Sequence, residues 1–240
     1  MKEIKRKKAE KKFLIINFKN YEEGVGFNAE KLAKLIESFS DEFKRLNLEV
    51  FVVVNPTDVF RIASKTRKTR IKIFSVAEPL TYGRNTGFVI PEALKQNKCS
   101  GLLINHSEHR ISFEGIKFLV QASKKLKMLS LVCIPDASKL SEMISLNPDF
   151  IALEPPELIE GKVSVSSARP ELIKEAVVIF NSKNKNKTKK TILLCGAGVK
   201  NNKDVRKALE LGTNGVLVAS GLLKAKNKKK ELLNLINGFA

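Results

Sequence analysis

Eight short apolar runs, separated by helical patterns, are the feature that most limits how this chain can fold. The runs span 13–18, 50–54, 71–75, 101–105, 128–134, 150–153, 191–195 and 215–219. They are almost continuously apolar instead of alternating with polar residues, which is typical of strands buried on both faces. Eight such strands alternating with helices predict an α/β fold, a single-domain (β/α)8 barrel, rather than an open sheet.

The segments between these runs carry helical periodicity. Segment 29–39 places Leu32, Leu35 and Ile36 on one face, and 113–126, 172–180, 204–211 and 229–236 show similar spacing. Asn202 or Asp204 is expected to cap the helix at 204–211. The first strand is followed by residues 17–21, Asn-Phe-Lys-Asn-Tyr, without the glycine fingerprint of a dinucleotide-binding sheet, so that fold is disfavoured.

Length and composition fit one barrel. The chain has 240 residues, 43% of them apolar, and a barrel of this type takes roughly 250. We expect residues 1–12 to form a basic tail and residues 13–240 the barrel domain. No apolar run approaches the roughly 18 residues that a membrane span needs. The three cysteines are far apart in the sequence, which favours a reducing, cytoplasmic location over a disulfide scaffold.

The charge is strongly unbalanced, with 44 Lys and Arg against 25 Asp and Glu, a net charge of +19. Much of the excess lies in segments 2–12, 183–190 and 224–230, which we interpret as solvated faces. A basic surface attracts phosphorylated metabolites. Nucleic-acid binding is not expected, because the chain has no Trp and two Tyr, and no aromatic residues alternate with the basic ones.

Polar residues cluster where the predicted strands end. In a (β/α)8 barrel the active site lies at the carboxyl ends of the strands. The residues there are Asn17 and Lys19, segment 105–108 (Asn-His-Ser-Glu), Glu154, segment 196–198 (Gly-Ala-Gly) and segment 219–221 (Ala-Ser-Gly). The last two segments follow strands seven and eight, where barrels commonly bind phosphate through main-chain N–H groups.

These side chains suit proton transfer beside a carbonyl group. That chemistry needs a carboxylate base and a group that stabilises an enediolate. It requires no metal, and the two histidines, His106 and His109, offer no obvious ligand cluster. We expect no cofactor, and we interpret His109 as a surface or packing residue.

Five motifs resemble those of the archaeal-type triosephosphate isomerases. They are Ile-Asn-Phe-Lys at 16–19, Asn-His-Ser-Glu-His-Arg at 105–110, Leu-Glu-Pro-Pro-Glu-Leu-Ile at 153–159, Cys-Gly-Ala-Gly-Val at 195–199 and Gly-Val-Leu-Val-Ala-Ser-Gly at 215–221. The resemblance covers roughly residues 13–238, in the order and spacing of the family. It implies the interconversion of dihydroxyacetone phosphate and D-glyceraldehyde 3-phosphate, a step of glycolysis and gluconeogenesis.

The resemblance also implies a role for each matching residue. Glu154 would be the base, His106 a neutral electrophile and Lys19 a positive charge near the substrate, with Glu108 ion-paired to a basic neighbour. Asn17 would help to orient the substrate. Its phosphate would be bound by Ile159, Gly198, Ala219 and Ser220, and residues 157–165 would form a closing lid.

A loop at 82–87 matches the family segment that inserts into a partner subunit, so Thr86 implies a homodimer or homotetramer. One departure lies in the lid, where Glu160 replaces a glycine, and we expect its carboxylate to point away from the phosphate. Two alternatives stay open. The chain could be another phosphosugar-binding barrel enzyme, or an inactive barrel whose basic surface binds nucleic acid.

Overall fold

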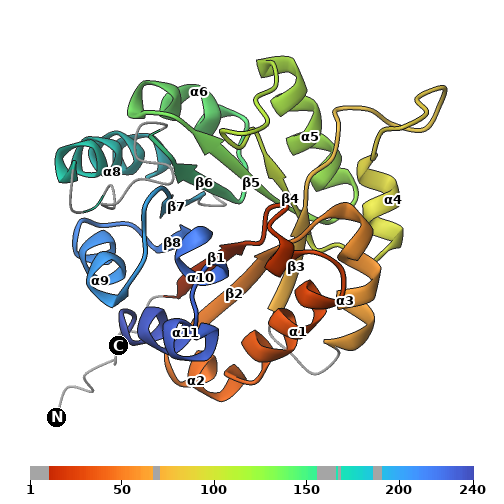
Figure 1. Ribbon diagram of the computed structural model, residues 1–240. Helices are drawn as coiled ribbons and strands as arrows, with labels where there is room; N and C mark the ends of the chain where they lie inside the picture. Colours follow the sequence, from red (N-terminus) through yellow and green to blue (C-terminus); the bar gives the residue numbers. More distant parts are fainter. Residues whose placement is uncertain (1–10, 67–70, 156–165, 167–168, 186–190) are drawn as a thin grey trace, which may run out of the picture.

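A computed structural model describes residues 11–66, 71–155, 166, 169–185 and 191–240. Eight parallel strands follow one another around a closed barrel, and β8 pairs with β1 to close it (Figure 1). The strands are β1 Lys12–Asn17, β2 Leu48–Val53, β3 Ile71–Ser75, β4 Gly101–Ile104, β5 Leu129–Ile134, β6 Phe150–Leu153, β7 Ile192–Cys195 and β8 Gly215–Val218. The predicted (β/α)8 barrel is confirmed, and the expected strand positions agree with the observed ones to within two residues.

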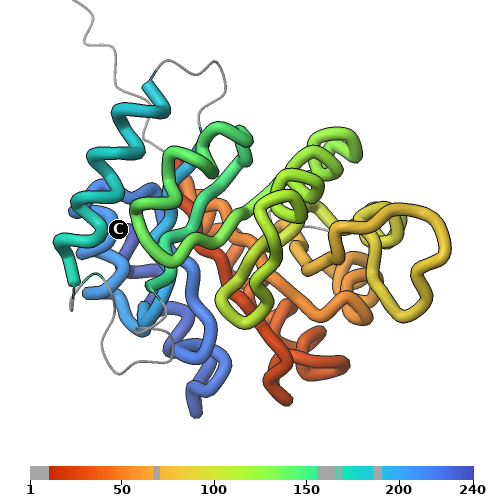
Figure 2. Tube along the Cα trace, turned by 90° about the horizontal axis from the view of Figure 1, so that it is seen from above, coloured from red at the N-terminus to blue at the C-terminus, as the bar shows by residue number. Residues whose placement is uncertain are grey.

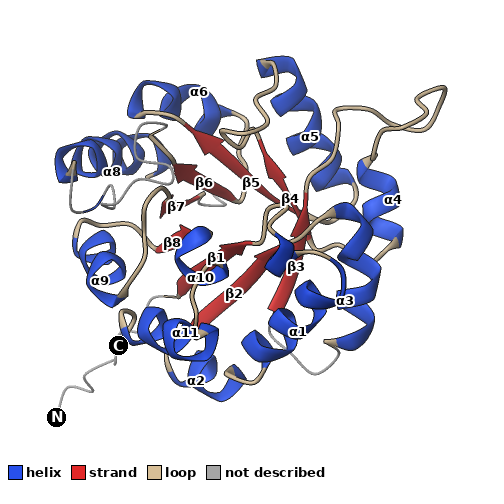
Figure 3. Cartoon of the chain, viewed as in Figure 1, coloured by secondary structure: helices blue, strands red, loops and turns tan. Residues whose placement is uncertain are grey.

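Helices surround the strands on the outside (Figure 3). They are α1 Gly26–Glu37, α2 Ser40–Arg45, α3 Val59–Lys65, α4 Pro91–Gln96, α5 Phe113–Lys125, α6 Leu140–Ser145, α8 Pro170–Asn184, α9 Asn202–Glu210, α10 Ser220–Leu223 and α11 Lys228–Asn237. In the part of the chain that the structure describes, three 3-10 helices follow β1, β2 and β5: η1 Glu22–Gly24, η2 Pro56–Asp58 and η3 Ala137–Lys139. The apolar faces of the helices and the outward side chains of the strands form one continuous core.

Inward side chains fill the barrel, so that it is a packed core and not a pore. The Phe51 ring stacks on Phe74 at 4.9 Å between centroids and meets Phe150 edge-on at 5.3 Å. Gly101 makes room for this cluster, because a Cβ there would lie 2.5 Å from the Phe74 ring. A filled interior leaves the rim of the barrel as the place for chemistry.

Two local expectations need correction. Asn201, not Asn202 or Asp204, caps α9, because its Oδ1 accepts hydrogen bonds from the N–H groups of the next residues, Lys203 and Asp204. Lys12, expected in the basic tail, is the first residue of β1 and pairs with Leu48. Residues 1–10 of that tail and 186–190 of the second basic segment lie outside the described residues.

Candidate active site

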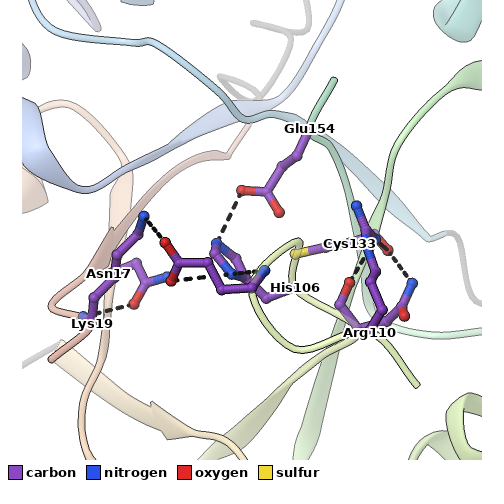
Figure 4. A network of polar contacts seen from close by, with 8 residues as sticks. Asn17, Lys19, His106, Arg110, Cys133 and Glu154 are labelled. Carbon is purple, nitrogen blue, oxygen red and sulfur yellow. Dashed lines mark hydrogen bonds and ion pairs between the residues drawn. The ribbon is translucent and has the colours of Figure 1, made fainter. Parts of the chain in front are cut away.

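The ends of β1, β4, β6, β7 and β8 bring the predicted side chains to one hollow. Lys19, His106 and Glu154 line it together with Gly198, Ala219 and Ser220. A second hollow, lined by Asn17 and Glu108, adjoins the first and shares Lys19 and His106 with it. Figure 4 shows the side chains of Lys19, His106 and Glu154 gathered from the segments that follow three different strands. The structure therefore gathers residues that are far apart in the sequence: Lys19 and Glu154, for example, are separated by 135 positions.

Glu154 follows β6 and is only 2% exposed. Its main-chain N–H donates to the Ile134 carbonyl at 2.8 Å, which extends the β5–β6 pairing by one residue. Its Oε2 is buried and accepts no hydrogen bond from any described residue. Gly196 supplies the space for this side chain, since a Cβ at that position would lie 2.5 Å from Glu154 Cγ. A buried carboxylate oxygen without a donor is available to take a proton from a ligand.

His106 is held with its Nε2 toward the carboxylate. The Glu108 N–H donates to His106 Nδ1 at 3.2 Å, so Nδ1 is the acceptor and the ring proton of the neutral imidazole sits on Nε2. Nε2 lies 3.6 Å from Glu154 Oε1. This arrangement presents a neutral N–H donor beside a carboxylate, which is the pair that enolisation of a carbonyl compound needs.

Lys19 lies in the loop after β1 with an unusual backbone conformation. Its φ is +50°, in the left-handed region that side chains other than glycine adopt at a cost. Asn17 stabilises that turn, because its Oδ1 accepts the Lys19 N–H at 3.0 Å. The Lys19 side chain is 9% exposed and places a positive charge at the wall shared by both hollows.

Glu108 connects the lysine and the histidine. Its Oε1 lies 2.6 Å from Lys19 Nζ, and its Oε2 lies 3.8 Å from His106 Nδ1. The carboxylate is about half exposed, so it shares its charge with solvent. Lys19 is thus the basic neighbour that pairs with Glu108. His109 also lines the second hollow, but its side chain is about half exposed and its Nε2 lies 3.2 Å from Glu78 Oε1.

The loops after β7 and β8 form the far wall of the first hollow. Ala197 and Gly198 have φ values of +69° and +71°, so two successive residues are left-handed. Ser220 begins α10, whose first N–H groups have no acceptor within so short a helix. Farther along the loop after β7, the Lys200 N–H donates to Asp204 Oδ2 at 3.0 Å, which holds this loop against the first turn of α9. Left-handed turns and helix starts expose main-chain N–H groups, and such groups suit a phosphate.

Three contributors to the site were not predicted as such. Asn105 Nδ2 and Arg110 Nη1 both donate to the Cys133 carbonyl, at 3.0 and 3.4 Å, and so tie the ends of β4 and β5 together (Figure 4). Burial and the nearby Glu154 carboxylate raise the pKa of the Cys133 thiol well above its ordinary value, so the thiol stays protonated beside the carboxylate. The sequence offers one signal for this network, because Asn105 ends a buried strand.

The lid at 157–165, with Ile159 and Glu160, lies outside the described residues. Among the residues that are described, no cluster of three or more His, Cys, Asp or Glu side chains could hold a metal ion. Within the same part of the chain, no helix is long and apolar enough to cross a membrane.

Comparison with known proteins gives a consistent result. The family described as triosephosphate isomerase matches residues 12–239. The triosephosphate isomerase of Methanothermus fervidus is 38% identical over 93% of this chain and 96% of that protein. The enzyme of the same name from Cenarchaeum symbiosum is also 38% identical, over 95% and 97% of the two chains. The crystal structure of triosephosphate isomerase from Bartonella henselae has a TM-score of 0.73 at 20% identity, covering 95% of this chain and 99% of that one, which shows a shared fold. The match to nearly the whole sequence shows that this chain belongs to the triosephosphate isomerase family.

Proposed function

We infer that this site interconverts dihydroxyacetone phosphate and D-glyceraldehyde 3-phosphate, with Glu154 as the base and His106 as the electrophile. The reaction is that of the family to which the chain belongs. This family is a standard example of acid–base tuning by environment. The observation that carries the residue roles is the pairing of two groups: a buried Glu154 carboxylate oxygen that accepts no hydrogen bond from the described residues, and an Nε2–H donor on His106.

In the first step Glu154 takes a proton from the substrate carbon next to the carbonyl group. The electron pair of that C–H bond forms the carbon–carbon double bond of an enediolate, and the carbonyl oxygen becomes negatively charged. His106 Nε2–H donates to that oxygen, which lowers the energy of the charge where it develops. In the second step the protonated Glu154 returns its proton to the adjacent carbon, and a proton shifts between the two oxygens to complete the isomer.

Lys19 supplies a positive charge for the dianionic substrate. Its side chain lies between the two hollows, next to both the histidine and the phosphate loops. Gly198, Ala219 and Ser220 line the end where the phosphate would bind, and their main-chain N–H groups would hold it without a side-chain cation. Ile159 would close over this end from the lid. Every step uses protein groups alone, so the proposal includes no cofactor.

An assay with both triose phosphates, run in each direction, tests the function, and Glu154→Gln tests the base. We expect the wild type to interconvert the two compounds and the variant to lose about 10²- to 10⁴-fold in kcat, with little change in substrate affinity. Glu142→Gln, on the exposed face of α6, is the matched control and should keep full activity. A wild type active on other phosphosugars alone would point to a different barrel enzyme.

The loop between β3 and α4 supports a homo-oligomer. It projects from the barrel in Figures 1 and 2, and Tyr82 and Phe88 on it are 64% and 58% exposed. Exposed aromatic side chains on a projecting loop are typical of an interface. We therefore propose at least a homodimer in which the Thr86 loop reaches the partner.

We also propose a cytoplasmic location. The three cysteines are buried and unpaired, as in proteins of a reducing compartment. Glycolytic chemistry on phosphorylated trioses fits the same compartment.

A further inference from the structure

Tyr21, two residues after Lys19, lies between two lysines of the barrel rim. Lys19 Nζ is 5.7 Å from the centroid of the Tyr21 ring, and Lys224 Nζ is 4.3 Å from it. Both distances are within the roughly 6 Å at which the face of an aromatic ring attracts a cation. The ring is partly buried against the core, and the Tyr21 carbonyl accepts the Gly24 N–H at 2.8 Å. The main chain of Tyr21 is thus held in a turn, and its partly buried ring lies within reach of both ammonium groups.

Lys224 connects this ring to the predicted phosphate site. It is the C-cap residue of α10, the helix that begins with Ser220 in the wall of the hollow. Lys224 Nζ also lies 3.5 Å from Glu23 Oε2, in the same segment as Tyr21. The segment after β1 and the helix after β8 thus meet through one ring and one carboxylate, where the barrel closes (Figure 1).

We propose that Tyr21 is a positioning residue for the isomerisation: its ring holds the ammonium groups of Lys19 and Lys224 at the rim and thereby links the substrate-facing lysine to the phosphate-binding helix. An aromatic ring attracts an ammonium group without neutralising it. Each ammonium group already has a carboxylate neighbour, Glu108 for Lys19 and Glu23 for Lys224, so the ring adds attraction without cancelling more of the positive field that a phosphate dianion meets. The ring also offsets the mutual repulsion of two cations brought close together.

This inference rests on the proposed active site, so the experiment tests the site with one variant and the role of Tyr21 with two others. Lys19→Met tests the site itself: unchanged binding of 2-phosphoglycolate by that variant would contradict the role of Lys19 and leave Tyr21 without a function to support. The comparison of Tyr21→Phe with Tyr21→Leu tests the ring, because phenylalanine keeps the aromatic face and leucine removes it. The measurements are kcat and KM for glyceraldehyde 3-phosphate and the Kd of 2-phosphoglycolate.

We expect Tyr21→Phe to stay within about twofold of the wild type in every constant, since the ring faces are similar. We expect Tyr21→Leu to raise KM and the Kd of 2-phosphoglycolate about fivefold, with a smaller change in kcat, because the field of the lysines acts on the bound phosphate in ground and transition states alike. Lys224→Met should raise the Kd by a larger factor when Tyr21 is present than in the Tyr21→Leu background, since the ring helps Glu23 to hold Lys224 in place.

Phe60→Leu is the matched control. Phe60 also has a lysine near its ring, with Lys98 Nζ at 5.8 Å from the centroid, and both residues lie away from the hollow. This variant should leave the kinetics unchanged. Two results would overturn the proposal: Tyr21→Leu binding 2-phosphoglycolate as tightly as Tyr21→Phe, or the effects of Tyr21→Leu and Lys224→Met simply adding. A loss of thermal stability alone, with kinetics intact, would assign Tyr21 to packing.

Discussion

Gly196 shows how a missing side chain fixes the position of the base. A Cβ on this residue would lie 2.5 Å from Glu154 Cγ and 3.2 Å from its Oε1, closer than real Cβ contacts allow. Gly196→Ala should therefore push the carboxylate away from His106, and a displacement of about 1 Å in such a site costs on the order of 10²-fold in rate. We expect kcat to fall at least tenfold, as measured in the isomerase assay, while the fold is retained.

Gly115→Ala provides the comparison for that variant. Its added Cβ would meet its neighbours at 3.4 Å, which is ordinary contact, and the residue lies in α5 where alanine is the better helix former. We expect full activity and equal or slightly higher stability. An active Gly196→Ala enzyme would show that Glu154 does not depend on that space.

The buried thiols predict a pH dependence of stability. Burial raises the pKa of Cys99 from 9.0 to about 11, and it also raises the pKa values of Cys133 and Cys195. A group whose pKa is higher in the folded state stabilises the fold fully below its unfolded pKa and loses that contribution as the pH rises toward the folded value. We therefore expect the free energy of unfolding to fall between pH 9 and pH 11.

Urea denaturation at a series of pH values measures this effect, and Cys99→Ala isolates one thiol. For a shift of this size the contribution of Cys99 is at most about 3 kcal/mol. The variant should lose stability less steeply above pH 9 than the wild type does, even though lysine deprotonation affects both proteins. Equal slopes would show that Cys99 titrates alike in the folded and unfolded chains.

The start of α5 is stabilised by a side chain of a type that favours helix N-termini. Ser112 precedes it, and its Oγ accepts the Gly115 N–H at 3.1 Å, as an N-cap does. Ser112→Ala should lower the free energy of unfolding by about 1 kcal/mol, because one N–H at the helix start loses its acceptor. Chemical denaturation measures the change. Ser145→Ala, in the last turn of α6, serves as the control with less effect, since its hydroxyl only donates to a carbonyl one turn earlier.

The strands and the longer helices could be predicted and the shorter helices could not, for a physical reason. The strands are continuous apolar runs, and α5 and α11 have a clear apolar face, so local pattern is enough to identify them. The helices α3, α4 and α6 have six or seven residues each, too short to be stable alone, and they form because the barrel packs against them. The four residues of α10 carry even less periodic signal.

The same distinction applies to the candidate site. The sequence could place Lys19, His106 and Glu154 at strand ends, because parallel strands in a barrel all end at one rim. It could not predict that Gly196 makes room for Glu154, or that the Tyr21 ring meets Lys224, because each contact joins segments far apart in the chain. Only the register of neighbouring strands determines which of these residues meet.

At the scale of the whole molecule, the β3–α4 loop predicts that the protein forms an oligomer. Tyr82 and Phe88 expose large apolar surfaces on a segment that projects from the barrel (Figure 2), and a monomer would leave both in water. We expect the wild type to sediment as a dimer or larger. Phe88→Asp should shift it toward the monomer, because burying an unpaired carboxylate in an interface is costly.

Val178→Asp is the control for this variant. Val178 is 69% exposed on α8, which lies on the opposite side of the barrel in Figure 1, so the substitution should leave the assembly intact. Sedimentation velocity at several protein concentrations measures both variants. A wild type that is monomeric at every concentration, or a Phe88→Asp variant that assembles like the wild type, would exclude this loop as the subunit contact.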